Sequence, residues 1–286
     1  MSSFRSKMTA ALRRVARLLP PNNPVRGGLS RAWSRLMRLG GRFMEVPIGS
    51  RHVRLLIELR HLDPNYEADT IQAWLALLAP GETAWDVGAN IGLFTLLAGQ
   101  QVGPTGRVIT WEPSPVTCRI TRDHVIANNL SEIVTVHQAA ISDRAGSMPF
   151  SVSSDYSTDR LGGEQQGSNT IHVRVETLDS HLSAGTPVPV CVKIDVEGAE
   201  VFALRGAKEL MSIGGPRPII LLAVHPMFLP EFNCRPEELV ELTAQADYLS
   251  FSMIGELASP TEYAEYVLVP REKEMQTKQK LGWKVS

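Results

Sequence analysis

One acid and two glycines occur together in the stretch Thr83–Gly92, which reads Thr-Ala-Trp-Asp-Val-Gly-Ala-Asn-Ile-Gly. A β-prone run reaches Asp86, continues through two glycines and enters an apolar helical pattern. Glycines let the backbone approach a ligand without a Cβ in the way, and the helix N-terminus offers free N–H groups. In parallel sheets, ligands bind at the carboxyl ends of the strands. The stretch therefore predicts a ligand-binding turn whose candidate residues are Asp86, Gly88, Asn90 and Gly92.

The spacing of this turn bears on the class of ligand. A nicotinamide-dinucleotide site requires G-x-G-x-x-G and no acid just before the turn. Here the spacing is Gly-x-x-x-Gly, and the carboxylate of Asp86 would repel a pyrophosphate. A ligand that carries an ammonium and a sulfonium fits an acidic turn better. The turn therefore favours S-adenosylmethionine over NAD.

Two further segments fit the same ligand. Glu112 ends the next predicted strand, where a carboxylate can accept both hydroxyls of a ribose. After the following strand, Ala139–Asp143 begins with small residues that would leave room for an adenine ring. We therefore add Glu112, Ser142 and Asp143 to the candidate cofactor-binding residues.

In chain order these motifs resemble the FkbM family of S-adenosylmethionine-dependent methyltransferases. The resemblance rests on Asp86-Val-Gly-Ala-Asn-Ile-Gly92, Trp111-Glu-Pro113, Ala140-Ile-Ser-Asp143 and Val192-Lys-Ile-Asp-Val-Glu-Gly-Ala-Glu200. It covers roughly residues 66–225, and the last motif is the most specific. The resemblance implies O-methylation of a hydroxyl on a sugar, a glycan or a secondary metabolite. The family often has a Glu two residues before the histidine of the fifth strand, whereas this sequence has Ala223 before His225.

Three residues at strand ends are the candidates for catalysis: Asp195, His225 and Lys193. Strand alternation places Lys193, Asp195 and Glu197 on one side, and we expect Asp195 to face the transferred methyl. A sugar hydroxyl ionises only near the pKa of water, so it needs a base or a divalent metal. Asp195, Glu197 and His225 could provide either, and this donor set suits Mg²⁺ or Mn²⁺ better than zinc. Structural alternatives are an ion pair for Lys193 and a helix-capping role for Glu200.

Strand-like and helix-like patterns alternate along the body of the chain. The expected strands are Thr83–Val87, Arg107–Trp111, Ile133–Ala139, Val190–Val196, Pro218–Val224, Tyr248–Ile254 and Tyr263–Val269. The expected helices are one that starts after Asp63-Pro64 and others at 91–101, 114–129, 199–212 and 236–246. This order predicts an α/β fold, and with the resemblance a Rossmann-like class I methyltransferase fold: a mostly parallel seven-stranded sheet with helices on both faces.

Around this core we expect three other parts. A small antiparallel pair is predicted at Phe43–Pro47 and His52–Leu59, at the start of a methyltransferase domain that spans residues 43–270. The Ser/Gly/Asp-rich stretch 142–170 is predicted to be a disordered or functional loop. Residues 271–286 are predicted to be a charged, frayed C-terminal tail.

Residues 1–42 form a basic arm. Residues 1–60 hold 13 Lys+Arg and two acids, a charge of 13 − 2 = +11 in a chain whose formal net charge is −1. Amphipathic Arg-rich helices of this kind bind anionic membrane surfaces, pack on the body or on a second subunit of a homo-oligomer, or serve as an organellar presequence. Nucleic acid is disfavoured, because interleaved aromatics and a recognised binding module are absent from the sequence.

Composition narrows the remaining choices. The 286 residues are 43% apolar, as in a globular protein, and three widely spaced cysteines argue against a disulfide framework or a paired-cysteine zinc site. They fit a reducing compartment, so we expect a cytoplasmic protein, peripheral at a membrane if the arm binds one. The apolar runs are too short to span a bilayer. Two alternatives to a methyltransferase stay open: an NAD(P)-dependent oxidoreductase and a catalytically silent, membrane-associated module.

Overall fold

The computed structural model describes residues 42–59, 62–152, 160–161, 169–212 and 214–284. It divides into two compact units that separate between Tyr66 and Glu67. In the first unit, β1 (Phe43–Ile48) and β2 (Arg51–Leu56) pair antiparallel, as predicted. Residues 1–41 of the predicted arm lie outside the described residues, so its helices and its binding partner stay predictions.

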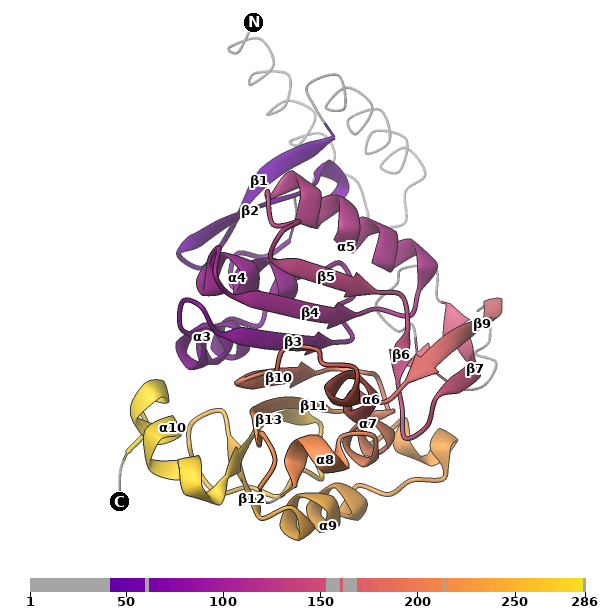
Figure 1. Ribbon diagram of the computed structural model, residues 1–286, viewed down its shortest axis with the longest axis vertical. Helices are drawn as coiled ribbons and strands as arrows, with labels where there is room; N and C mark the ends of the chain where they lie inside the picture. The colour runs from indigo at the N-terminus through magenta and orange to yellow at the C-terminus, as the bar shows by residue number, and fades with distance from the viewer. Residues whose placement is uncertain (1–41, 60–61, 153–159, 162–168, 213, 285–286) are drawn as a thin grey trace, which may run out of the picture. The chain divides into compact units, whose positions relative to one another are not determined.

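The second unit contains a sheet of seven strands in the order β12-β13-β11-β10-β3-β4-β5 (Figure 1). Their bounds are β3 (Thr83–Val87), β4 (Arg107–Trp111), β5 (Val134–His137), β10 (Cys191–Ile194), β11 (Ile219–Val224), β12 (Tyr248–Ser252) and β13 (Ala264–Pro270). The sheet is mixed: the pairings from β11 through β10, β3 and β4 to β5 are parallel, and both pairings of β13 are antiparallel. All seven strands that the sequence predicts are present.

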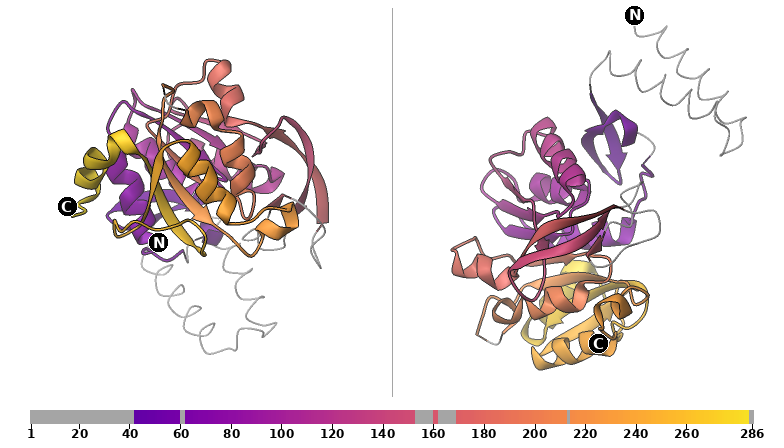
Figure 2. Two further views of the ribbon diagram at one scale, coloured as in Figure 1. Left: turned by 90° about the horizontal axis from the view of Figure 1, so that it is seen from below. Right: turned by 90° about the vertical axis from the view of Figure 1, so that its right-hand side faces the viewer.

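The central strands are apolar runs that the sheet buries on both faces. Every residue of β10 and β11 is buried, which is typical of strands covered by helices on both sides. On one face, α4 (Leu93–Val102) packs on β3 and β4, α5 (Pro115–Ala127) on β5, and α10 (Glu274–Leu281) on β13 and on α3 (Ala68–Leu77). On the other face, α7 (Glu200–Arg205) packs on β11, and α9 (Glu237–Gln245) on β12. Figure 2 shows α10 in yellow and α9 in orange on opposite sides of the sheet.

The order of the strands predicts where a ligand binds. Starting from β3, the chain adds β4 and β5 on one side and later adds β10 and β11 on the other. The crevice at such a reversal, beyond the carboxyl ends of the strands, is the usual ligand site of open α/β sheets. In this sheet the reversal lies between β3 and β10, the two strands that carry the main motifs.

The stretch expected to be a loop is largely a second sheet. Four strands in the order β6-β9-β7-β8 form it: β6 (Ala140–Ile141), β7 (Gly146–Val152), β8 (Arg160–Leu161) and β9 (Asn169–Glu176). Phe150, Val173 and Val175 belong to the buried core, so apolar residues of this sheet are part of the body. The prediction of a disordered or functional loop across 142–170 is therefore wrong for the strands. Residues 153–159 and 162–168 lie outside the described residues.

Two other expectations need correction. The helix predicted at 199–212 is interrupted: α7 ends at Arg205 and α8 (Lys208–Met211) follows. A Cβ on Gly206 would lie 2.0 Å from the carbonyl oxygen of Ser142. Glycine is therefore required at position 206 by close packing rather than by helix propensity. The frayed tail expected at 271–286 instead contains α10, whose Lys280 donates to the carbonyl of Leu77 on α3.

The three cysteines are free and buried. Among the described residues, every helix is too short or too polar to cross a lipid bilayer.

Candidate active site

The glycine turn follows β3 and lies against the end of β10. Gly88, Asn90 and Gly92 all have positive φ, at 85°, 50° and 83°. A Cβ on Gly88 would lie 1.8 Å from the carbonyl oxygen of Asp195, and the amide of Asp195 donates to Val87. Glycine is therefore required at position 88 by its conformation and by the close approach of two backbones.

Asp86 lies at the base of this turn and is 1% exposed. Its Oδ2 accepts a hydrogen bond from Thr95 on α4, whereas Oδ1 is buried without a hydrogen-bond partner among the described residues. Burial raises the pKa of Asp86, against the opposing effect of the Lys193 ammonium. Because a buried carboxylate oxygen is costly without a partner, this atom suits a ligand ammonium. The residues thus fit the methionine ammonium of the cofactor that the sequence predicts.

Glu112 connects the end of β4 to the glycine turn. Its Oε2 accepts from the amide of Asn90 at 2.7 Å, and Oε1 accepts from the amide of Ser114 and the hydroxyl of Thr117, both at 2.8 Å. These bonds hold the carboxylate at the turn, and its contact with a ribose hydroxyl stays a prediction. Glu112 therefore shapes the turn whether or not it also contacts a ligand.

Ser142 and Asp143 are placed differently from the other predicted cofactor residues. Ser142 follows β6 of the second sheet, is fully buried and donates to Asp143 at 3.3 Å. Its amide donates to Glu176, and its backbone packs against Gly206. The contacts of Ser142 are thus those of a packed strand end, and its predicted contact with an adenine ring stays a prediction.

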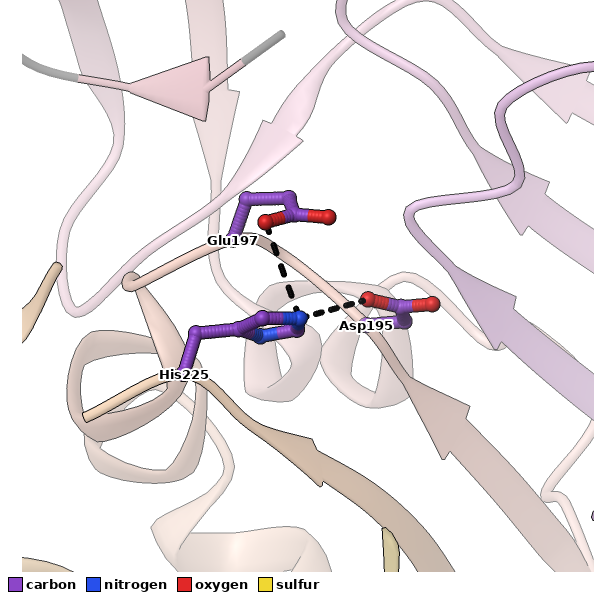
Figure 3. Close-up of side chains that lie close together, drawn as sticks. All are labelled: Asp195, Glu197 and His225. Carbon is purple, nitrogen blue, oxygen red and sulfur yellow. Dashed lines mark ion pairs between the residues drawn. The ribbon is translucent and has the colours of Figure 1, made fainter. Parts of the chain in front are cut away.

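Asp195, Glu197 and His225 converge just beyond the carboxyl ends of β10 and β11 (Figure 3). His225 Nε2 lies 3.6 Å from Glu197 Oε2 and 3.9 Å from Asp195 Oδ1. One ligand atom from each residue lies within 4.8 Å of the other two. The structure therefore brings together the three residues that the sequence proposes for a base or a metal. We name them the acid–histidine cluster.

Lys193 holds one of these acids. Its Nζ donates to Asp195 Oδ2 at 2.9 Å and lies 4.3 Å from the centre of the Phe94 ring. Burial alone would lower the pKa of Lys193, but the charges of Asp195, Glu265 and Asp86 raise it above the usual range. Burial would raise the pKa of Asp195, but Lys193 outweighs it and holds that pKa below its usual range. Lys193 is thus a fixed cation and the ion-pair partner of Asp195, which argues against a role as proton acceptor.

Glu200 is a contributor to the site that sequence reasoning assigned to helix capping. Its fully buried Oε1 accepts from the amide of Gly198 at 2.9 Å and bonds to His225 Nδ1 at 2.8 Å. Burial alone would lower the pKa of His225, but the bond to Glu200 and the charges of Glu197 and Asp195 raise it to about 8. Burial raises the pKa of Glu197 to about 7, against the charge of His225. Glu200 thus bonds to an amide before the N-cap residue of α7, without a side-chain capping bond on that helix, and it also fixes the orientation of the histidine ring.

A second unexpected acid, Glu265, lies on β13. It is the direct antiparallel partner of Ala223 on β11, two residues before His225. Burial raises the pKa of Glu265 to about 7, and its Oε2 is buried without a hydrogen-bond partner among the described residues. The position where the resembling family often has a glutamate is thus filled by alanine, and a carboxylate comes from the neighbouring strand. Only the strand register, which the sequence does not reveal, could have identified it.

Aromatic rings border the histidine on two sides. Phe228 stacks on His225 with ring centres 6.2 Å apart, and Tyr263 meets it edge-on at 5.5 Å. Tyr263 is 67% exposed, whereas the side chain of His225 is 9% exposed.

Residues 86–256 match the family described as Methyltransferase FkbM domain. This chain belongs to the FkbM methyltransferase family. The match extends from Asp86 past His225, so it contains the glycine turn, Glu112 and the acid–histidine cluster. Membership implies S-adenosylmethionine as the cofactor, and Oδ1 of Asp86, which has no hydrogen-bond partner within the described part of the chain, fits its ammonium. The predicted resemblance is confirmed.

The individual relatives that match this FkbM family member share fewer than half of the aligned residues with it. It is 28% identical to the hexuronic acid methyltransferase AglP of Haloferax volcanii over 187 residues, which is 64% of this chain and 70% of that protein. It is 39% identical to the 31-O-demethyl-FK506 methyltransferase FkbM of Streptomyces tacrolimicus over 69 residues, 24% of this chain and 25% of the relative. A match to an arsenite methyltransferase of Halobacterium salinarum covers 15% of that protein. The matches thus span a quarter or less of two of these relatives.

A solved structure of a methyltransferase FkbM from Methylobacillus flagellatus KT is 18% identical, with a TM-score of 0.42. The comparison covers 92% of this chain and 58% of that one.

Proposed function

We propose that this protein is an S-adenosylmethionine-dependent O-methyltransferase that acts on a hydroxyl of a sugar, glycan or secondary metabolite. The observation that carries the proposal is the contact of Gly88 with Asp195, which joins the predicted cofactor turn to the acid–histidine cluster. The family match supports methyl transfer over the oxidoreductase alternative. The hydroxyl acceptor is supported by the family and by the names of two relatives, which include a hexuronic acid methyltransferase.

The residues around the turn would hold the cofactor. Asp86 offers its buried oxygen to the ammonium, and Glu112 lies where a ribose is expected. When bound, S-adenosylmethionine supplies an electrophilic methyl group. The task left to the protein is to align the acceptor, exclude water and take up a proton.

The acid–histidine cluster is suited to the acceptor side of this reaction. Asp195 is a carboxylate held by Lys193, with Oδ1 directed toward His225. It can accept a hydrogen bond from the acceptor hydroxyl, while Nε2 of His225 or the carboxylate of Glu197 takes up the proton. The same three residues could instead hold Mg²⁺ or Mn²⁺, which would lower the pKa of a bound hydroxyl.

The test uses the purified full-length chain. Calorimetry should show binding of S-adenosylmethionine and S-adenosylhomocysteine but not of NAD⁺. Tritiated methyl should then pass to fractions of a cell extract or to methyl glycosides of hexuronic acids, and Asp195→Asn should abolish most of the transfer. Product that survives mild base is a methyl ether, whereas release of tritiated methanol identifies a carboxyl ester. Base-labile product, or binding of NAD⁺ in place of S-adenosylmethionine, contradicts the proposal.

A further inference from the structure

The donor atoms of the acid–histidine cluster are arranged around one point. Asp195 comes from the end of β10, Glu197 from the turn that follows, and His225 from the end of β11, and Figure 3 shows their polar ends facing one another. One donor atom from each lies within 4.8 Å of the other two. Two carboxylate oxygens and one imidazole nitrogen form a donor set that Mg²⁺ and Mn²⁺ accept.

The distances within the cluster are too long for hydrogen bonds. Nε2 of His225 lies 3.6 Å from Glu197 and 3.9 Å from Asp195, beyond the usual range of about 2.7–3.2 Å. Two ligands of an octahedral ion with bonds of about 2.1 Å are about 3.0 Å apart when adjacent and about 4.2 Å apart when opposite. The two distances from Nε2 lie between these values and equal neither, so the side chains must shift to coordinate an ion. The His225 side chain is 9% exposed, and its Nε2 is directed at the two carboxylates without a hydrogen bond to either.

A buried carboxylate determines which nitrogen of His225 faces the cluster. Glu200 Oε1 accepts from Nδ1 at 2.8 Å and from the amide of Gly198, so the hydrogen of a neutral ring lies on Nδ1. The lone pair is then on Nε2, which faces Asp195 and Glu197. Histidine ligands of metals are commonly oriented by a carboxylate on the other ring nitrogen.

The surrounding charge also favours a cation. Asp195 accepts from Lys193 with Oδ2 and directs Oδ1 toward His225. The ion pair with Lys193 therefore does not turn Oδ1 away from the cluster. Glu197 and Glu200 add two carboxylates beside one histidine, Lys193 is already bound to Asp195, and Arg160, whose charge also acts on Glu197, is paired with Glu231. Sites with an excess of one charge raise the local concentration of the opposite ion.

We propose that Asp195, Glu197 and His225 bind one Mg²⁺ or Mn²⁺ ion, that Glu200 orients His225 for it, and that the ion receives the acceptor hydroxyl. The last part rests on the proposed function. A hydroxyl bound to a divalent cation loses its proton more readily, so the ion would take the place of a strong base.

The test uses Mn²⁺ alone as the probe of the full-length chain after treatment with EDTA and dialysis. Electron paramagnetic resonance and calorimetry, with and without S-adenosylhomocysteine, should show one bound ion. Glu197→Gln and His225→Asn should each weaken binding by tenfold or more. Glu200→Gln should weaken it by about 10- to 100-fold, as for other residues that orient a ligand. Glu237→Gln, an exposed acid on α9, is the matched control and should bind as the wild type does.

A second readout does not depend on affinity or on the acceptor. Electron spin-echo spectroscopy of the Mn²⁺ complex should show coupling to an imidazole nitrogen, and His225→Asn should remove it while the far-ultraviolet circular dichroism is unchanged. Absence of Mn²⁺ binding at millimolar concentration, or binding that all four variants retain equally, overturns the proposal.

The cation site and the proposed function can fail separately. Methyl transfer that proceeds unchanged in EDTA, by a chain that binds no Mn²⁺, overturns the cation and retains the methyltransferase. If the wild type binds Mn²⁺ but not S-adenosylmethionine, and the variants of Glu197, Glu200 and His225 lose the Mn²⁺, the site is supported and the proposed function is overturned.

Discussion

The backbone of Gly88 approaches Asp195 so closely that a Cβ at position 88 would lie 1.8 Å from the Asp195 carbonyl oxygen. Gly88→Ala should therefore destabilise the fold by more than the roughly 1–2 kcal/mol that a left-handed backbone conformation costs an alanine. Gly185→Ala is the matched control, because Gly185 has φ 79° but its Cβ would meet no described atom within 4 Å beyond its chain neighbours. Urea denaturation measures both, and equal losses would show that the close approach costs nothing.

Glu112→Ala should weaken the binding of S-adenosylmethionine by about 10- to 150-fold, because a hydrogen bond to a charged group is worth roughly 1.5–3 kcal/mol. Thr117→Val separates the two roles of Glu112. It removes one protein hydrogen bond to Oε1 but leaves the carboxylate in place. Calorimetry should show a much smaller loss for Thr117→Val. Unchanged affinity in a folded Glu112→Ala protein refutes the ribose assignment.

Asp195→Asn should lower turnover by roughly 10²- to 10⁴-fold with nearly unchanged affinity for S-adenosylmethionine, because the lost interaction belongs to the transition state. The substitution also leaves Lys193 buried without its closest partner, which destabilises the fold. A second substitution, Lys193→Met, should restore part of the stability but none of the turnover. Recovery of turnover in the double variant would mean that Asp195 acts only by neutralising Lys193.

Glu265→Gln should make the fold more stable at high pH. Burial raises the pKa of Glu265 in the folded state from 4.5 to about 7, so the native state holds its proton over a range where the unfolded state has lost it. The wild type therefore loses stability as the pH rises from about 4.5 to about 7, by up to about 3 kcal/mol. Urea denaturation should show the variant to be the more stable protein at pH 8, with a smaller difference at pH 5. Glu256→Gln, on an exposed residue, should show neither effect.

The basic arm, residues 1–42, should bind anionic membranes through its excess of arginine and lysine. Each basic residue near such a surface contributes about 1 kcal/mol, and salt screens the attraction. The full-length chain should therefore sediment with phosphatidylserine vesicles and be released by added salt. Charge reversal at Arg13, Arg14 and Arg17 should weaken the sedimentation, and binding that salt does not change would argue against an electrostatic arm.

Local signals in the sequence predicted the strands and the cofactor turn well. The bounds of β3 and β4 agree with the predicted ones, because apolar runs bounded by glycine and acidic residues mark strand ends without reference to the rest of the chain. The convergence of Asp195 and His225 was also predictable, since parallel neighbouring strands end at the same edge of a sheet.

Residues far apart in the sequence determine the features that were missed. Ile171, Val173 and Val175 alternate with polar residues, which is a local signal for β9, but residues 153–168 between β7 and β9 carry no apolar pattern, so the pairing of the two strands was not predictable. Glu200 and Glu265 acquire their roles from contacts with His225 and from the register of β11 with β13. The break after α7 depends on the approach of Ser142 to Gly206. None of these contacts follows from periodicity or propensity.

The reversal of strand order between β3 and β10 also bears on how such an enzyme diversifies. Asp86 and Glu112 come from β3 and β4, whereas Asp195 and His225 come from β10 and β11, and the two groups of strands pair only where β3 meets β10. Under the proposed function, β3 and β4 bind S-adenosylmethionine, whereas β10 and β11 face the acceptor. Substitutions in β10 and β11 can therefore alter acceptor choice while β3 and β4 are preserved, so exchange of the segment from β10 to β13 between relatives offers a route to new acceptors.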